Sequence, residues 1–260
     1  MMQKHPYSFF RFLRVLIPYL FLYIPILVLI LFSFNSKPFP ANWEHFTLDW
    51  YYRLFRNGEV WSAFFTSLLV ATFATFFSLM MGILLIFFRS AGGKVGKAAT
   101  LFYGNLLVPE TVLALSLLGY FTFFRIRLGL TTLVVAHTGL GLGVVIPILY
   151  ARYAAIDSRL LEVSQVSGAN TYRTFRRVLL PLLLPTLSAT GFLIFILSFD
   201  DFILAYFCSG PSCQTLSLYL LSMLKTGISP MINALSTVLF LVSGLFIVLF
   251  CVSKARHRVF

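Results

Sequence analysis

The sequence predicts an all-α integral membrane protein with six transmembrane helices. The 260 residues include 59% hydrophobic and only 11% charged residues, with a mean hydropathy of +0.92, whereas soluble domains are roughly a quarter charged. Six apolar runs are long enough to cross about 30 Å of hydrocarbon, which takes ~20 helical residues. Lipid offers no partner for backbone polar groups, and no run alternates as a barrel strand does. We therefore expect helices throughout.

The six runs form one membrane domain that covers residues 1–260. The opening run is too long for the apolar part of a signal peptide, and no small-residue cleavage site follows it, so we expect it to be retained as a span. The expected spans are about 15–34, 61–88, 98–124, 131–150, 180–207 and 233–253.

Basic residues are concentrated in alternate gaps between these spans. Fourteen of the 20 Lys and Arg residues lie at the two ends of the chain and in the second and fourth gaps. Cytoplasmic segments of membrane proteins carry such an excess of positive charge. We therefore expect both termini in the cytoplasm. The net charge of +12 is accounted for by topology, which excludes nucleic acid as the expected partner.

The first gap, residues 35–60, is rich in aromatic residues, among them Trp43 and Trp50. Such side chains gather where a membrane meets water. We expect a short amphipathic helix on the outer membrane surface, and docking of an outside partner is the alternative.

The longest cytoplasmic gap, about residues 152–178, has apolar residues at helical spacing up to Gly168. A glycine there ends a helix, and Asn170 or the threonine after it caps a second one. We expect two short helices, joined by a glycine turn and parallel to the membrane, that run up to Pro181. Phe175 stands among arginines and is expected to be exposed as a docking knob. A solvated basic loop is the alternative.

This gap contains, at a characteristic spacing, Glu162, Gly168, Ala169, Phe175 and Pro181. In these residues the chain resembles the membrane subunits of type I bacterial ABC importers, and it departs from their pattern at Val163, Ser164 and Ser167. The resemblance implies that residues 152–178 are coupling helices, which insert into a cytoplasmic dimer of ATPase subunits, and that the five matching residues make this coupling.

No G-x-x-x-x-G-K-[ST] motif for phosphate binding occurs in the sequence. We therefore expect no cofactor on this chain and no ATPase activity of its own. The resemblance implies that ATP and Mg are bound by the partner ATPase subunits. An intramembrane enzyme would need a nucleophile, a base or metal ligands converging at one depth. The chain lacks an H-E-x-x-H motif, and His137 has no obvious Ser or Cys partner at its depth, which argues against this class.

Three acids, Glu110, Asp200 and Asp201, fall inside apolar runs, where ionisable residues are costly and mark functional sites. Carboxylates beside aromatic rings suit an organic cation. The neighbouring rings that we expect to line the substrate pathway with them are Phe199, Phe202 and Tyr206. The alternatives are an ion pair with a partner subunit and a protonated acid making one hydrogen bond.

Span four carries a single histidine, His137, followed by three glycines at alternate positions. We expect His137 to hydrogen-bond a neighbouring helix and not to relay protons. The glycines allow neighbouring helices to approach closely. They are Gly139, Gly141 and Gly143.

Several short runs are more specific than the coupling loop. They are Val108-Pro109-Glu110, Ser198-Phe199-Asp200-Asp201-Phe202, Ser209-Gly210-Pro211 and Gly227-Ile228-Ser229-Pro230 with Asn233-Ala234-Leu235. In them the chain resembles the second permease of spermidine/putrescine importers. The resemblance implies a bacterial inner-membrane complex with a second homologous permease, an ATPase pair and a periplasmic or lipid-anchored binding protein. Another cargo (ferric iron, thiamine or a phosphonate) and a stand-alone secondary transporter are the alternatives.

The cysteines have no metal-ligand spacing. Cys208 and Cys213 flank a short loop, and the sequence leaves open whether they form a disulfide or remain two thiols.

Overall fold

The computed structural model describes residues 7–37, 42–105, 107–211, 213–226 and 230–256. The described chain is helical, apart from turns and one isolated antiparallel bridge between Asn35 and Phe46. It divides into two compact units, Met1–Gly58 with Leu220–Phe260, and Glu59–Tyr219. The predicted all-α class is confirmed.

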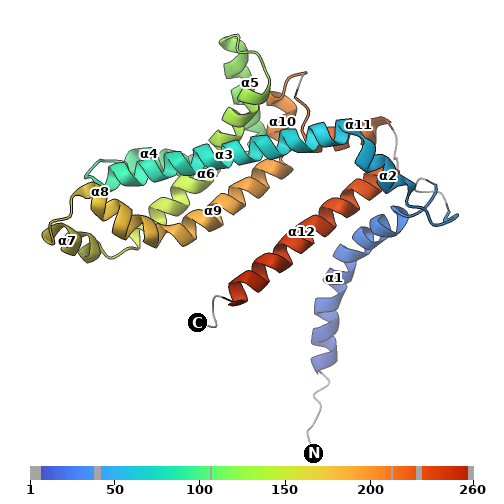
Figure 1. Ribbon diagram of the computed structural model, residues 1–260, viewed down its shortest axis with the longest axis horizontal. Helices are drawn as coiled ribbons and strands as arrows, with labels where there is room; N and C mark the ends of the chain where they lie inside the picture. Colours follow the sequence, from blue (N-terminus) through green and yellow to red (C-terminus); the bar gives the residue numbers. More distant parts are fainter. Residues whose placement is uncertain (1–6, 38–41, 106, 212, 227–229, 257–260) are drawn as a thin grey trace, which may run out of the picture. The chain divides into compact units, whose positions relative to one another are not determined.

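The first unit contains α1 (Tyr7–Phe32), α2 (Asp49–Arg56) and α12 (Pro230–Arg256). α12 packs against both α1 and α2, and it lies beside α1 in Figure 1. No residue of α1 between Arg14 and Phe32 is buried within the chain. This apolar, outward-facing surface suits contact with lipid.

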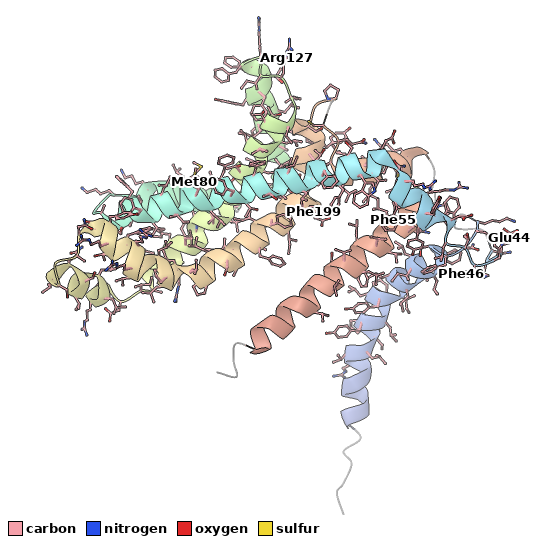
Figure 2. All side chains as sticks on the ribbon, viewed as in Figure 1. Glu44, Phe46, Phe55, Met80, Arg127 and Phe199 are labelled. Carbon is pink, nitrogen blue, oxygen red and sulfur yellow. The ribbon has the colours of Figure 1, made fainter. Side chains whose placement is uncertain are left out.

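Asn35 orders the segment between α1 and α2. Its buried side chain accepts a hydrogen bond of 3.0 Å from the backbone N–H of Glu44, and its carbonyl accepts one of 2.9 Å from the indole N–H of Trp50. The helix α2 that follows is strongly amphipathic, and Phe46 and Phe55 are exposed beside it (Figure 2). The short amphipathic helix is confirmed, and its position on a membrane surface stays a prediction.

The second unit is organised around α6, which packs against α4, α5, α9 and α10. The arrangement of α3, α4, α6 and α9 is visible in Figure 1. The remaining helices are α3 (Gly58–Ser90), α4 (Gly96–Asn105), α5 (Glu110–Phe123), α6 (Leu130–Ala154), α7 (Ser158–Val166), α8 (Thr171–Thr174), a π-helical turn η1 (Phe175–Leu179), α9 (Leu180–Asp200), α10 (Ile203–Cys208) and α11 (Leu216–Thr226).

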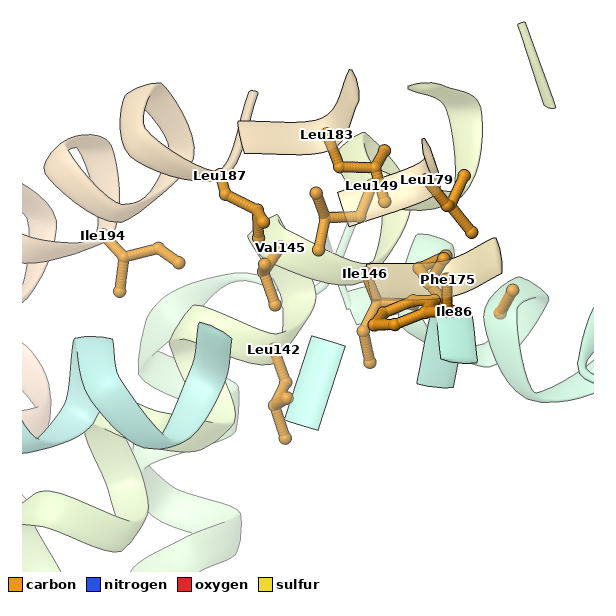
Figure 3. Packing of buried hydrophobic residues seen from close by; sticks show 11 residues of the cluster. Ile86, Leu142, Val145, Ile146, Leu149, Phe175, Leu179, Leu183, Leu187 and Ile194 are labelled. Atoms are coloured by element: carbon orange, nitrogen blue, oxygen red, sulfur yellow. The ribbon is translucent and has the colours of Figure 1, made fainter. Parts of the chain in front are cut away.

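The core of the second unit lies where α6 meets α9 and α3. Leu142 and Leu149 of α6 pack in one cluster with Leu183 and Leu187 of α9 (Figure 3). The pairs are seven and four residues apart, and each spacing places both leucines on one face of the helix. The cluster therefore holds the predicted fourth and fifth spans side by side.

Two of the three glycines in α6 serve the expected close approach. A Cβ atom at Gly141 would overlap the side chain of Ser78 in α3, and one at Gly143 would overlap Asn105 of α4. Only open space surrounds the same position at Gly139. The prediction is confirmed for Gly141 and Gly143 and is wrong for Gly139.

Among the described residues, four helical stretches are long and apolar enough to cross a membrane. They are Arg14–Phe32, Gly58–Ser90, Leu130–Ala154 and Thr171–Asp200, and the bent pair Ala99–Asn105 and Glu110–Phe123 would make a fifth. They correspond to the first five predicted spans. The sixth predicted span, residues 233–253, lies within α12, where the described residues include an apolar helical stretch from Pro230 to Leu245.

Two predicted spans differ from single straight helices. The third bends by 111° between α4 and α5, where Pro109 precedes Glu110 and has no N–H to continue the helix. The fifth begins earlier than predicted, at Thr171, and its helix ends at Asp200 with a break before α10. Each break lies beside one of the intramembrane acids.

Candidate functional site

The two adjacent acids at the end of α9 lie in different environments. The helix ends at Asp200, and the backbone of Asp201 is extended, with φ −64° and ψ 133°. Asp200 is exposed, whereas the side chain of Asp201 is only 2% exposed. Of the two, Asp201 is therefore the acid that lies against neighbouring helices of this chain.

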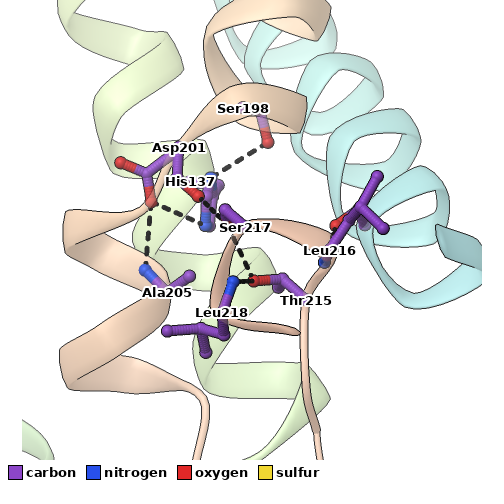
Figure 4. Close-up of polar contacts among 9 residues, drawn as sticks. His137, Ser198, Asp201, Ala205, Thr215, Leu216, Ser217 and Leu218 are labelled. Atoms are coloured by element: carbon purple, nitrogen blue, oxygen red, sulfur yellow. Dashed lines mark hydrogen bonds and ion pairs between the residues drawn. The ribbon is translucent and has the colours of Figure 1, made fainter. Parts of the chain in front are cut away.

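Asp201 contacts groups from three helices, α10, α6 and α11 (Figure 4). One carboxylate oxygen, Oδ2, accepts a hydrogen bond of 3.0 Å from the backbone N–H of Ala205, and it lies 3.6 Å from Nε2 of His137 in α6. The carbonyl oxygen of Asp201 accepts a bond of 2.7 Å from the hydroxyl of Ser217. Asp201 thus acts as a side-chain cap for α10 and joins it to α6 and α11.

Glu110 is the second acid of this site. It begins α5, is half-buried, and lies close enough to Asp201 for the two carboxyl groups to interact. α5 packs against α10, which brings the two acids together. Within the described chain, His137 is the only basic side chain within 4.0 Å of Asp201. Two carboxylates so close repel each other unless a proton or a cation lies between them.

The aromatic residues near this site pair with each other. Phe199 packs edge-on against Phe64 of α3 with ring centroids 5.9 Å apart. Phe202 immediately precedes α10 and Tyr206 lies within it. Their ring centroids are 5.6 Å apart, and both side chains are exposed. Exposed ring faces next to an acid pair are available to a cation. The structure thus brings Glu110 and Asp201 together and leaves Asp200 and these two rings at the surface of the unit.

Sequence reasoning missed the place of His137 beside Asp201. The expected hydrogen bond to a neighbouring helix exists, since Nδ1 lies 3.0 Å from the hydroxyl of Ser198 in α9. The expectation that His137 has no serine partner at its depth is wrong, since Ser198 is that partner, and the second neighbour, Asp201, was not foreseen. A lone histidine in an apolar run is as costly as a lone acid, so the same rule that singled out the acids could have paired it with them.

Residues 152–178, predicted to be coupling helices and called the coupling segment below, contain α7 as their first separate helix. α7 has no buried residue. Asp157 caps it by accepting a hydrogen bond of 3.0 Å from the backbone N–H of Arg159. Three apolar side chains face outward, with Val163 64% and Val166 89% exposed beside the half-exposed Leu160. Glu162 is exposed on the same helix. A short helix with a bare apolar surface is suited to binding another chain.

The predicted glycine turn and cap follow α7. Gly168 has φ +84°, the left-handed conformation that favours glycine, and the N–H of Ala169 reaches back to the carbonyl of Ser164 at 3.1 Å. Asn170 caps the next helix, accepting a bond of 2.8 Å from the N–H of Arg173. The helix–turn–helix prediction is confirmed.

The second coupling helix differs from the prediction in two ways. It is continuous with the predicted fifth span from Thr171 to Asp200, because the π-helical turn η1 accommodates the missing N–H of Pro181. Phe175 is also 7% exposed and packs edge-on against Phe87 of α3 with centroids 5.0 Å apart. The prediction of an exposed docking knob at Phe175 is therefore wrong. Neighbouring residues of the same segment line an open basic hollow on the surface. They are Asn170, Tyr172, Arg173, Arg176 and Arg177.

Cys208 and Cys213 carry free thiols in the structure, and Cys208 is buried. The carbonyl of Cys208 accepts a hydrogen bond of 2.8 Å from the hydroxyl of Thr132 in α6. This contact joins the end of α10 to α6.

No protein-family model matches the chain. Among curated proteins, it is 37% identical over 228 residues to the spermidine/putrescine transport system permease protein PotC of Escherichia coli (strain K12), over 86% of both chains. It is 35% identical to the PotC of Haemophilus influenzae, over 93% of this chain and 95% of that one. It is 29% identical to the putrescine transport system permease protein PotI of Escherichia coli (strain K12), over 95% and 92%.

Among solved structures, the chain is similar to one from a bacterial ABC transporter that imports the acidic polysaccharide alginate. The TM-score is 0.71, and the match covers 98% of both chains at 14% sequence identity. At this identity the likeness shows the fold alone, an ABC importer permease fold.

Proposed function

The chain belongs to the permease subunits of bacterial spermidine/putrescine transport systems, and from this premise we propose that it forms half of the path by which a polyamine enters the cell. As a permease subunit it is a multi-pass membrane protein and not the ATPase. The acid cluster is the observation that best supports a cationic cargo. Glu110 lies within interaction range of Asp201, which follows the exposed Asp200 in the chain, and such a cluster favours a cation over a neutral or anionic solute.

Six spans with both termini in the cytoplasm are part of this proposal. Five are supported by the long helical stretches and the bent pair α4–α5, and the sixth by α12. The excess of Lys and Arg in alternate gaps supports the direction. In this topology α7 and α8 lie in the cytoplasm, and the segment from Asn35 to α2 lies outside.

The proposed partners are a second permease, a cytoplasmic pair of ATPase subunits that binds ATP and Mg, and an outer substrate-binding protein. We place the ATPase contact on the exposed apolar side chains of α7 (Leu160, Val163 and Val166). Phe175 supports this contact from within, because its ring fixes the coupling segment on α3. Motion of the ATPase pair would then reach the acid cluster through the continuous helix from Thr171 to Asp200.

The test is uptake by the whole transporter in proteoliposomes. We expect ATP-driven accumulation of labelled spermidine that unlabelled putrescine and spermidine reduce and that thiamine or a phosphonate does not. Competition by thiamine or a phosphonate, without competition by polyamines, would overturn the cargo. Accumulation by this chain alone, without ATPase, would overturn the whole proposal in favour of a secondary transporter.

A further inference from the structure

His137 is enclosed between two polar groups of one helix end. The residue is 1% exposed on α6. Nδ1 lies 3.0 Å from the hydroxyl of Ser198, and Nε2 lies 3.6 Å from Oδ2 of Asp201. Ser198 lies in the last turn of α9, and Asp201 is the extended residue that follows the helix end. The imidazole therefore bridges the last turn of α9 and the break that follows it (Figure 4).

This geometry favours one tautomer of the ring. Nε2 is buried and has no hydrogen-bond partner among the described residues, and Oδ2 of Asp201 lies 3.6 Å from it. If Ser198 donates its hydroxyl proton to Nδ1, the proton of the neutral ring lies on Nε2 and points toward the carboxylate. The opposite tautomer would turn a lone pair toward a carboxylate oxygen in the protein interior. The Nε2–H form is therefore favoured.

The imidazole of His137 restricts the orientation of the Asp201 side chain, which the local backbone does not restrain. Asp201 lies outside α9, in an extended residue between two helices, so no helical turn restrains its side chain. Oδ2 is held by the N–H of Ala205 and faces His137, and the other oxygen points away from both (Figure 4). Glu110 lies close enough to interact with the carboxylate so oriented.

We propose that His137 is a positioning residue of the permease: it holds the carboxylate of Asp201 in the orientation that binds the cationic cargo, without touching the cargo itself. Both ring nitrogens face groups of this chain, Nδ1 toward Ser198 and Nε2 toward Asp201, so neither is left to bind a solute. The inference rests on the proposed function, because it names a residue that tunes the same acid cluster. Groups of this kind set ligand affinity by orienting the residue that makes the contact.

Two replacements separate this role from simple packing. Asn at position 137 reaches the Ser198 side with a polar atom near the place of Nδ1, but it is too short for Asp201. Gln has its terminal amide near the place of Nε2 and can donate to Asp201. In proteoliposomes that contain the whole transporter, we expect His137→Asn to raise the KM for spermidine about tenfold, because the carboxylate of Asp201 loses the neighbour that holds its orientation. We expect His137→Gln to stay close to the parent.

A result in which the two variants are alike, both normal or both equally impaired, would overturn the proposal. So would a His137→Asn defect confined to the maximal rate with an unchanged KM. The parent-like His137→Gln variant also serves as the control for folding and assembly.

A double-variant cycle with Asp201→Asn shows whether His137 acts through Asp201. We expect His137→Asn to raise the KM far less when Asp201 is already Asn, whereas additive effects would contradict the proposal. Thermal unfolding of the same four complexes measures the coupling of the two side chains without cargo. We expect non-additive shifts there as well, and additive shifts would refute the contact. A parent complex that takes up no spermidine would refute the proposed function, and this second cycle would still decide on the contact.

Discussion

Replacing Asp201 by Asn is expected to remove most polyamine uptake while it leaves the fold intact. Asn keeps an oxygen that accepts the N–H of Ala205, and Asn caps helices as well as Asp does. The change therefore removes a negative charge without removing the cap of α10. Losing one member of a buried charge pair costs at least ~2 kcal/mol, which corresponds to about 30-fold in affinity. Uptake of labelled spermidine by membrane vesicles measures the loss.

Asp49→Asn is the matched control for this variant, because it removes one carboxylate from the exposed surface of α2. It should transport as the parent does. If Asp201→Asn transported normally at limiting spermidine, while Asp200→Asn did too, the acid pair would have no part in the cargo path. A loss of the protein from the membrane would instead show that Asp201 stabilises the break between α9 and α10.

The second large effect is expected on α7, where Val166→Asp should abolish binding of the ATPase. Val166 is 89% exposed and makes the end of the outward apolar surface with Val163. A carboxylate there would have to be buried without a partner in the complex, which costs several kcal/mol. We expect the ATPase subunits to be lost from the purified transporter and ATP-driven uptake to fall to background. Co-purification and uptake assays measure the two effects.

Gln165→Asp is the control for charge on this helix. It adds the same carboxylate to an exposed neighbour that points about 100° away from Val166. This variant should retain the ATPase. A Val166→Asp transporter that keeps its ATPase and its uptake would show that the coupling contact lies elsewhere, and the basic hollow around Arg173 would then be the next surface to test.

The sequence predicted those parts of the fold that depend on composition and local chemistry. The apolar runs gave the long helices, and the glycine at position 168 and the Asn170 cap gave the turn of the coupling segment. These features follow from the residue and its immediate neighbours. The candidate acids were found for the same reason, since a carboxylate in an apolar run is visible without a structure.

Features that depend on contacts between distant residues were missed. Phe175 sits among arginines in the sequence, but its ring packs against Phe87, which lies 88 residues earlier in the chain. The pairing of His137 with Asp201 has the same cause, because it joins α6 to the end of α9. The break after Asp200 was missed because no proline or glycine marks it, and what holds it is the cap that Asp201 makes with Ala205.

The proposed mechanism depends on one contact, in which a cytoplasmic ATPase binds this permease through the exposed apolar side chains of α7. Photo-crosslinking in native membranes tests it most directly, with the crosslinking amino acid placed at Val166 in one variant and at Phe175 in another. We expect the ATPase subunit to be captured from position 166, where the native side chain is 89% exposed, and not from position 175, where it is 7% exposed. Capture from position 175 without capture from position 166, or capture of an outer binding protein from position 166, would contradict it.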